Sequence, residues 1–192
     1  MTARVGCANL ITRMRGLTNS GTADYTVNAA SYWTDAQVQD VLDRNRVELY
    51  RDPLQMIQQY DGGSVVYLKY QSAFQNLETG TNLELQTAAG STLGTALYTV
   101  DQQRGMITFA ANTSGSTYYI TGFAYDMNSV AAAMWREKMA HYTTAVDFST
   151  ARNVSIDRSQ LMANCLVMAK SFESKSSRGM RTINLWRSDT DD

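Results

Sequence analysis

The residues whose chemistry could support catalysis or metal binding are few and far apart in this chain. It has one histidine, His141, and two cysteines, Cys7 and Cys165, in 192 residues. Nucleophilic catalysis needs a base, an orienting carboxylate and a nucleophile together, and no such set can be placed around His141. One histidine excludes a multi-histidine metal centre, and two cysteines exclude a four-thiolate zinc site and a disulfide-dense scaffold. We interpret His141 as a structural residue and both cysteines as small buried hydrophobic residues.

Short motifs that bind nucleotides or carry catalysis do not occur either. The chain lacks G-x-S-x-G, a Walker loop, G-x-G-x-x-G, H-E-x-x-H and C-x-x-C. A net charge of −1, from 17 basic and 18 acidic residues, excludes a chain-wide basic protein that coats nucleic acid by charge alone. No secretory leader pattern is present, and no apolar run approaches the roughly 20 residues of a membrane span. We therefore expect a soluble protein made in a cytosol, not an enzyme, with no catalytic residue, metal, cofactor or membrane partner.

Composition divides the chain into zones, and the elements predicted for these zones would carry any functional surface. Residues 1–61 and 126–174 are charged and helix-like, whereas residues 62–125 hold eight of the twelve glycines and only five charged residues. The predicted fold class is α+β. It has a helical bundle framework of about four helices (1–61 and 126–174), a small antiparallel β sandwich or barrel inserted at 62–125, and an extended C-terminal tail at 175–192.

The first zone predicts a weak helix over 4–16 and a strong one over 35–51. Thr34 and Gln37 have the spacing of a capping box, and Trp33 before the cap can pack on Val38 as a hydrophobic staple. The Asp-Pro pair at 52–53 is expected to end this helix. The face opposite its apolar stripe is either solvated or a subunit contact of mixed charge; it carries Asp40, Asp43, Arg44, Arg46 and Glu48.

The middle zone predicts strands over 65–74 and 117–125 and a hairpin over 97–109. The hairpin closes on Gly105, which suits a glycine in the left-handed region. Its neighbouring tyrosines, Tyr67, Tyr118 and Tyr119, could form a stacking platform for a sugar or a base. The alternative is that they are ordinary half-buried strand residues.

Two helices are predicted after the strand-rich zone, over 127–148 and 158–174. Asp126 or Asn128 can cap the first of them. It carries two apolar stripes, which implies burial on most sides, either within the domain or between subunits. The candidates for subunit packing are Trp135, Met139 and Tyr142.

The C-terminal tail lacks a helical period and cannot bury itself. It is either a frayed terminus or a segment that becomes ordered on a partner, because tryptophan and arginine are favoured anchors at interfaces. A nucleic-acid arm is a weaker alternative, since acidic residues at the end partly cancel the charge. The candidate partner-binding residues are Arg178, Met180, Arg181, Ile183, Leu185, Trp186 and Arg187.

Three stretches, taken together and in this order, resemble the head-to-tail adaptor (connector) proteins of tailed bacteriophages. They are residues 32–44 (YWTDAQVQDVLDR), the hairpin at 101–109 (DQQRGMITF), and residues 125–160, which include AAAMWREK at 131–138, VDFS at 146–149 and SIDRSQ at 155–160. The resemblance covers most of residues 30–172. The β insertion departs from the smaller, all-helical adaptors.

The resemblance implies a structural virion protein of the phage neck, assembled in the host cytoplasm as a dodecameric ring. The ring would bind the portal protein, extend the channel through which double-stranded DNA passes without sequence-specific binding, and form a platform for the next neck protein. Residues 175–187 would dock on the portal. Separately, the modest apolar exposure expected of so polar a chain predicts that the isolated protein is monomeric or weakly associated. Two rival hypotheses are a carbohydrate- or receptor-binding virion module built on the β insertion, and a DNA-binding terminus factor.

Overall fold

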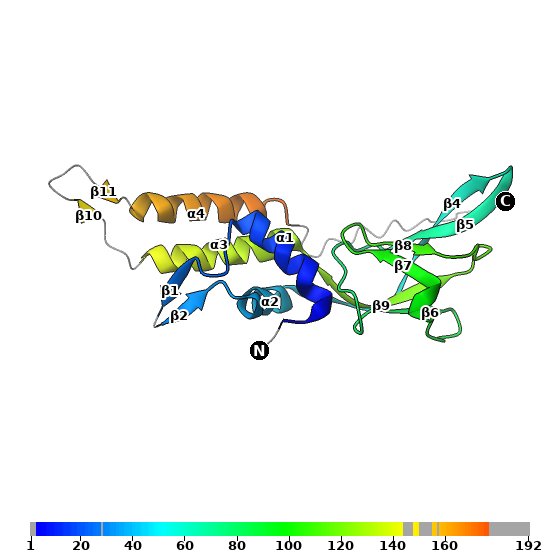
Figure 1. Ribbon diagram of the computed structural model, residues 1–192. Coiled ribbons are helices and arrows are strands. Elements are labelled where there is room, and N and C mark those ends of the chain that lie inside the picture. Colours follow the sequence, from blue (N-terminus) through cyan, green and yellow to red (C-terminus); the bar gives the residue numbers. More distant parts are fainter. Residues whose placement is uncertain (1–2, 28, 144–147, 150–154, 157, 177–192) are drawn as a thin grey trace, which may run out of the picture.

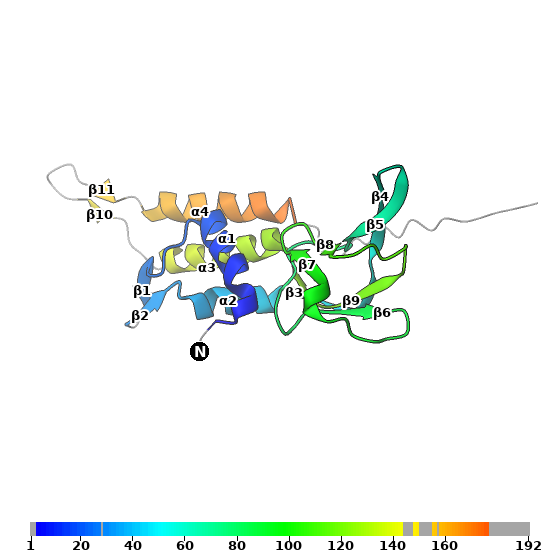
Figure 2. The same cartoon turned by 45° about the vertical axis from the view of Figure 1, so that its right-hand side comes forward.

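The computed structural model describes residues 3–27, 29–143, 148–149, 155–156 and 158–176. The described chain is elongated, with its helices at one end and its two larger sheets at the other (Figure 1, Figure 2). Each end has its own apolar core. The chain crosses between the two ends at residues 44–46 and again at 125–127, where a helix and a strand follow one another directly.

The helical end is built from four α-helices, in the part of the chain that the structure describes. A 3-10 turn, η1 (Val5–Cys7), leads into α1 (Ala8–Thr18), and these are followed by α2 (Asp35–Arg44), α3 (Met127–Thr143) and α4 (Arg158–Glu173). A short hairpin of β1 (Tyr25–Val27) and β2 (Ala30–Tyr32) joins α1 to α2. The core residues of this end include Cys7, Met14, Trp33, Leu42 and Met134.

The helix starts confirm the local sequence signals. Thr34 accepts a hydrogen bond from the amide of Gln37, whose side chain accepts one from the amide of Thr34, as a capping box requires. Trp33 and Val38 lie in the same core. Asp126 Oδ1 accepts the amides of residues 128 and 129 and so caps α3.

The sheet end holds two antiparallel sheets around the second core. One sheet has the order β3–β9–β6 and is formed by β3 (Arg46–Pro53), β9 (Tyr118–Tyr125) and β6 (Glu84–Thr87). The other has the order β4–β5–β8–β7 and is formed by β4 (Gln55–Asp61), β5 (Ser64–Gln71), β8 (Met106–Phe109) and β7 (Tyr98–Asp101), the last preceded by a 3-10 turn, η2 (Thr95–Leu97). Tyr70, Leu85, Ile107 and Ile120 are fully buried between the two sheets.

The predicted helical bundle framework is wrong: the fold is mixed α+β but rich in strands. The decisive error concerns residues 45–51, which were expected to complete a helix that ends at the Asp-Pro pair. The helix ends at Arg44, and residues 46–53 form β3, paired with β9. Leu49 fits both a helical stripe that continues from Val38 and the buried side of a strand, so the local pattern could not separate the two structures. The strand forms because it pairs with β9 and because Leu49 is buried in the second core.

Most strands expected in the middle zone are confirmed. The hairpin at 97–109 forms β7 and β8, and Gly105 in its turn has a φ of 68°. A side chain at Gly105 would collide with the carbonyl oxygen of Phe74, so the turn requires glycine for space as well as for conformation. Strands also form at 64–71 and 118–125, where strands over 65–74 and 117–125 were predicted, so the first ends three residues early.

The C-terminal elements differ in detail from the expectation. Helix α3 was expected to reach residue 148, which instead lies in β10 (Phe148–Ser149), paired with β11 (Ser155–Ile156). Helix α4 occupies the predicted range. The expected docking residues 178–187 lie outside the described residues, and the division into domains stays a prediction.

Candidate functional site

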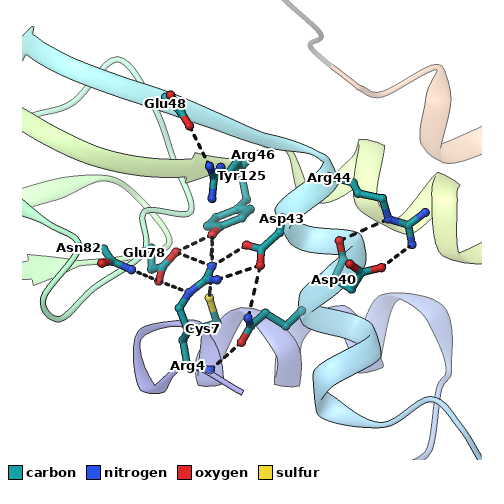
Figure 3. Close-up of polar contacts among 11 residues, drawn as sticks. Arg4, Cys7, Asp40, Asp43, Arg44, Arg46, Glu48, Glu78, Asn82 and Tyr125 are labelled. Atoms are coloured by element: carbon teal, nitrogen blue, oxygen red, sulfur yellow. Dashed lines mark hydrogen bonds and ion pairs between the residues drawn. The ribbon is translucent and has the colours of Figure 1, made fainter. Parts of the chain in front are cut away.

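A polar cluster joins the helical end to the sheet end of the molecule (Figure 3). We call it the Arg4 cluster, and its members come from the N-terminal segment, α2, the loop between β5 and β6, and β9. These residues are far apart in the sequence but share one network of hydrogen bonds; they are Arg4, Cys7, Asp43, Glu78, Asn82 and Tyr125.

The guanidinium of Arg4 lies between two carboxylates. Its Nη1 and Nη2 donate to Asp43 at 2.8 and 2.5 Å, and its Nε and Nη2 donate to Glu78 at 2.8 and 3.1 Å. Glu78 is fully buried, and it also accepts the hydroxyl of Tyr125 at 2.5 Å and the amide of Asn82 at 2.8 Å. Each carboxylate oxygen of Glu78 therefore has two donors.

Electrostatics keep Glu78 ionised inside this cluster. Burial by itself would raise the pKa of Glu78, but the hydrogen bonds from Arg4, Tyr125 and Asn82 outweigh it and lower that pKa. Burial and the neighbouring carboxylate raise the pKa of Tyr125, so its hydroxyl keeps its proton and donates. Burial, together with the charge of Glu78, likewise raises the pKa of the Cys7 thiol, which stays protonated at neutral pH.

This arrangement suits a structural joint better than a reaction centre. The oxygens of Glu78 are occupied by donors from this chain, and the Cys7 thiol is protonated and buried. Among the described residues, no three side chains of histidine, cysteine, aspartate or glutamate are grouped to hold a metal ion. The Arg4 cluster therefore links the helices to the sheets through an ion pair in which Glu78 is buried and Arg4 is partly exposed.

A buried lysine makes a second joint, within the helical end. Lys138 on α3 donates to Asp24 at 2.7 Å and to the carbonyl oxygens of Thr18 and Asn19, at 2.9 and 3.2 Å, where α1 ends. A cation is stabilised there because the last carbonyls of a helix lack partners of their own. His141, one turn further on, stacks on Tyr25 with ring centroids 3.9 Å apart.

The largest group of exposed apolar side chains on one helix, within the described residues, lies on α4. Helices α3 and α4 run side by side in both views, and Cys165 and Ala169 are the buried residues of α4 (Figure 1, Figure 2). Four large apolar side chains on the same helix are exposed, which we call the α4 outer face: Leu161, Leu166, Val167 and Met168. At about 100° per residue, Leu161 and Met168 lie on one side of the buried Cys165 and Ala169, Leu166 lies on the other side, and Val167 lies opposite. Val167 is 64% exposed, and no charged residue occurs between residues 159 and 169.

The residues predicted for subunit packing lie on the neighbouring helix. Trp135, Met139 and Tyr142 are each half-buried on α3. The indole nitrogen of Trp135 is buried and has no hydrogen-bond partner within the described residues. Their role in subunit packing stays a prediction. The sequence analysis assigned no role to the apolar residues of α4, although the uncharged run at 159–169 is a visible signal of an apolar helix.

The tyrosines considered as a stacking platform do not share one surface. Tyr118 packs edge-on against Tyr70 and near Phe109 in the core between the sheets. Tyr119 is the next residue on the same strand and therefore points to the opposite side, where the guanidinium of Arg51 lies 5.0 Å from its ring. The carbohydrate-binding hypothesis stays a prediction.

Comparisons with known proteins gave no match. No protein-family model, no curated protein and no solved structure matches the chain. None of the described helices is long and apolar enough to cross a membrane.

Proposed function

We propose that this chain is a subunit of a ring-forming head-to-tail adaptor in the neck of a tailed bacteriophage. In this proposal the ring binds the portal protein, extends the DNA channel and carries the next neck protein. The protein acts through shape and contact and catalyses no reaction.

The α4 outer face is the observation that carries the proposal. A helix that is apolar on most of its circumference is normally buried, because exposed apolar area is unfavourable in water. Here α3 covers only one side of α4, and Leu161, Leu166, Val167 and Met168 stay exposed. A second copy of this chain is the partner that a ring supplies at every position.

The elongated shape supports the same function. An adaptor ring needs one surface for the protein above it and a different one for the protein below it. The helices lie at one end of this molecule and the larger sheets at the other (Figure 1). The Arg4 cluster and its ion pair connect the two ends, so a load on one end is transmitted to the other.

Binding to portal-bearing capsids tests the proposal. Capsids that lack their neck proteins would be mixed with the purified full chain, sedimented, and imaged for a ring below the portal. We expect the wild type to form that ring and Val167→Glu to lose at least tenfold in occupancy, since a charge would be buried between subunits.

A matched valine provides the control. Val5 is 93% exposed and lies in the N-terminal 3-10 turn, so Val5→Glu makes the same chemical change away from α4. Attachment by Val5→Glu but not by Val167→Glu supports the proposal. Equal attachment by both variants contradicts an interface on α4, and density for the chain anywhere other than the neck contradicts the function itself.

The tail is the proposed contact with the portal. It combines three arginines with apolar anchors, and repeated weak sites in a ring gain strength through multivalency. Deleting residues 177–192 should abolish attachment to capsids, and the truncated chain of residues 1–176 should keep the unfolding transition of the full chain. Unchanged attachment would show that the portal contact lies elsewhere.

A further inference from the structure

The hairpin of β4 and β5 extends beyond the sheet to which it belongs. Strand β5 pairs with β8 only over residues 69–71, so its first five residues have β4 as their only strand partner. Figure 2 shows this hairpin rising from the sheets, at the end away from the helices. Met56, Tyr60 and Val65 on it are 40%, 75% and 40% exposed.

Within the described residues the outer edge of β4 has no strand partner, and a register shift between Ile57 and Gln59 is its one irregularity. Strand β4 ends its sheet, and within the described residues no backbone hydrogen bond from another segment reaches residues 55–60 across that edge. Proteins usually protect an open edge with charged side chains or proline. The edge strand β3 follows this rule with Arg46, Glu48, Arg51, Asp52 and Pro53, but residues 55–60 hold no charge and no proline.

Within the described residues, the same sheet has a second edge without a strand partner, at β7. Strand β7 also ends the sheet, and its residues 98–100 have no backbone partner beyond β8 within the described chain. Strand direction alternates across the order β4–β5–β8–β7, so β4 and β7 run in opposite directions. A second copy placed beside the first in the same orientation would therefore bring β4 antiparallel to β7 and continue the alternation.

The register of the sheet also matches across this contact. One row of side chains crosses the sheet toward the core and consists of Met56, Tyr70, Ile107 and Val100. Its two middle members are fully buried, whereas Met56 and Val100 at the two ends are only partly covered. Placing Met56 of one copy against Val100 of the next would cover both ends of the row with apolar contacts.

We propose that β4 of one copy adds to β7 of a second copy, so that the sheet continues from chain to chain. The contact joins the β4 edge of one copy to the β7 edge of the other. In a pair of copies, one β7 edge and one β4 edge therefore stay free to bind further copies. Such a head-to-tail contact propagates and closes into a ring where the rotation allows it. The inference needs only two copies of this chain and holds or fails independently of any role in a virion.

Disulfide trapping of the isolated full chain tests the contact. The next row of paired residues has Ile57 at its β4 end and Thr99 at its β7 end, and its side chains lie on the opposite side of the sheet from Met56 and Val100. Cysteines at these two positions would therefore face each other where β4 of one copy meets β7 of the next. We expect the double variant Ile57→Cys with Thr99→Cys, oxidised at high protein concentration, to give a reducible ladder of dimers, trimers and larger species. Cys7 and Cys165 are buried and are the same in every variant.

The control pair uses the same row without an open edge. Lys69 lies between Ile57 and Thr108 in that row, so Lys69→Cys with Thr99→Cys should give no ladder, because β4 covers its strand. Adding Met56→Lys to the first pair should suppress the ladder, since a lysine protects the edge. No ladder from the first pair, or a ladder equal to that of the control pair, overturns the inference. A dimer from Ile57→Cys alone also overturns it, because that product means that two copies of β4 pair with each other.

Discussion

Replacing the buried carboxylate of the Arg4 cluster tests whether this cluster holds the two ends of the molecule together. The change is Glu78→Gln, which keeps the size of the side chain and removes its charge. Breaking a buried ion pair by changing one partner typically costs about 3–5 kcal/mol. Arg4 is 32% exposed and retains Asp43 at 2.5 Å, which places the expected loss at the lower end of that range. We therefore expect Glu78→Gln to lower the free energy of unfolding by about 3 kcal/mol at pH 7.

The assay is urea unfolding, followed by tryptophan fluorescence and far-ultraviolet circular dichroism across a range of pH. The folded-state pKa of Glu78 is lowered from its usual value of 4.5, so its contribution is complete above that value and is lost as pH falls through the folded pKa. The difference between wild type and Glu78→Gln should therefore be constant near neutral pH and shrink below pH 4.5.

An exposed ion pair provides the matched control for this prediction. Glu48 pairs with Arg46 at 2.9 Å, but its side chain is 68% exposed, so Glu48→Gln should cost less than about 0.5 kcal/mol. If Glu78→Gln costs no more than Glu48→Gln, or if its cost does not change with pH, the Arg4 cluster is not a buried ionic joint.

Three further substitutions test the local physics of the fold by the same unfolding measurement. Thr34→Ala removes one half of the capping box of α2 and should cost about 1 kcal/mol, whereas no loss would mean that the cap is not formed in solution. Gly105→Ala should cost several kcal/mol more than Gly80→Ala, because both glycines have positive φ but only the first has a backbone oxygen within 2.0 Å of the added carbon; equal costs would contradict the close approach. Lys138→Met should cost about 2–3 kcal/mol by leaving Asp24 and the last carbonyls of α1 without their cation, and a neutral result would show that water replaces it.

The features that could be predicted from sequence are those whose partners lie close together in the chain. The capping box at Thr34, the turn at Gly105 and the cap at Asp126 each need residues within a few positions of one another. Their physical chemistry is local, so residue type and spacing are sufficient to specify them. The absence of nucleotide-binding and catalytic motifs is likewise visible in the chain itself.

The sequence by itself thus determined the starts of α2 and α3, the hairpin of β7 and β8, and the scarcity of catalytic side chains. Only the tertiary structure decided that residues 46–53 form a strand, that Arg4 meets Glu78 across 74 positions, and that α4 keeps an apolar face exposed. The physical reason is that a short apolar run fits both the helical period and the strand period. A partner strand decides between them by forming hydrogen bonds with the backbone groups of the run. The burial of a side chain, in turn, depends on which distant segment covers it, and the spacing of neighbouring residues does not identify that segment.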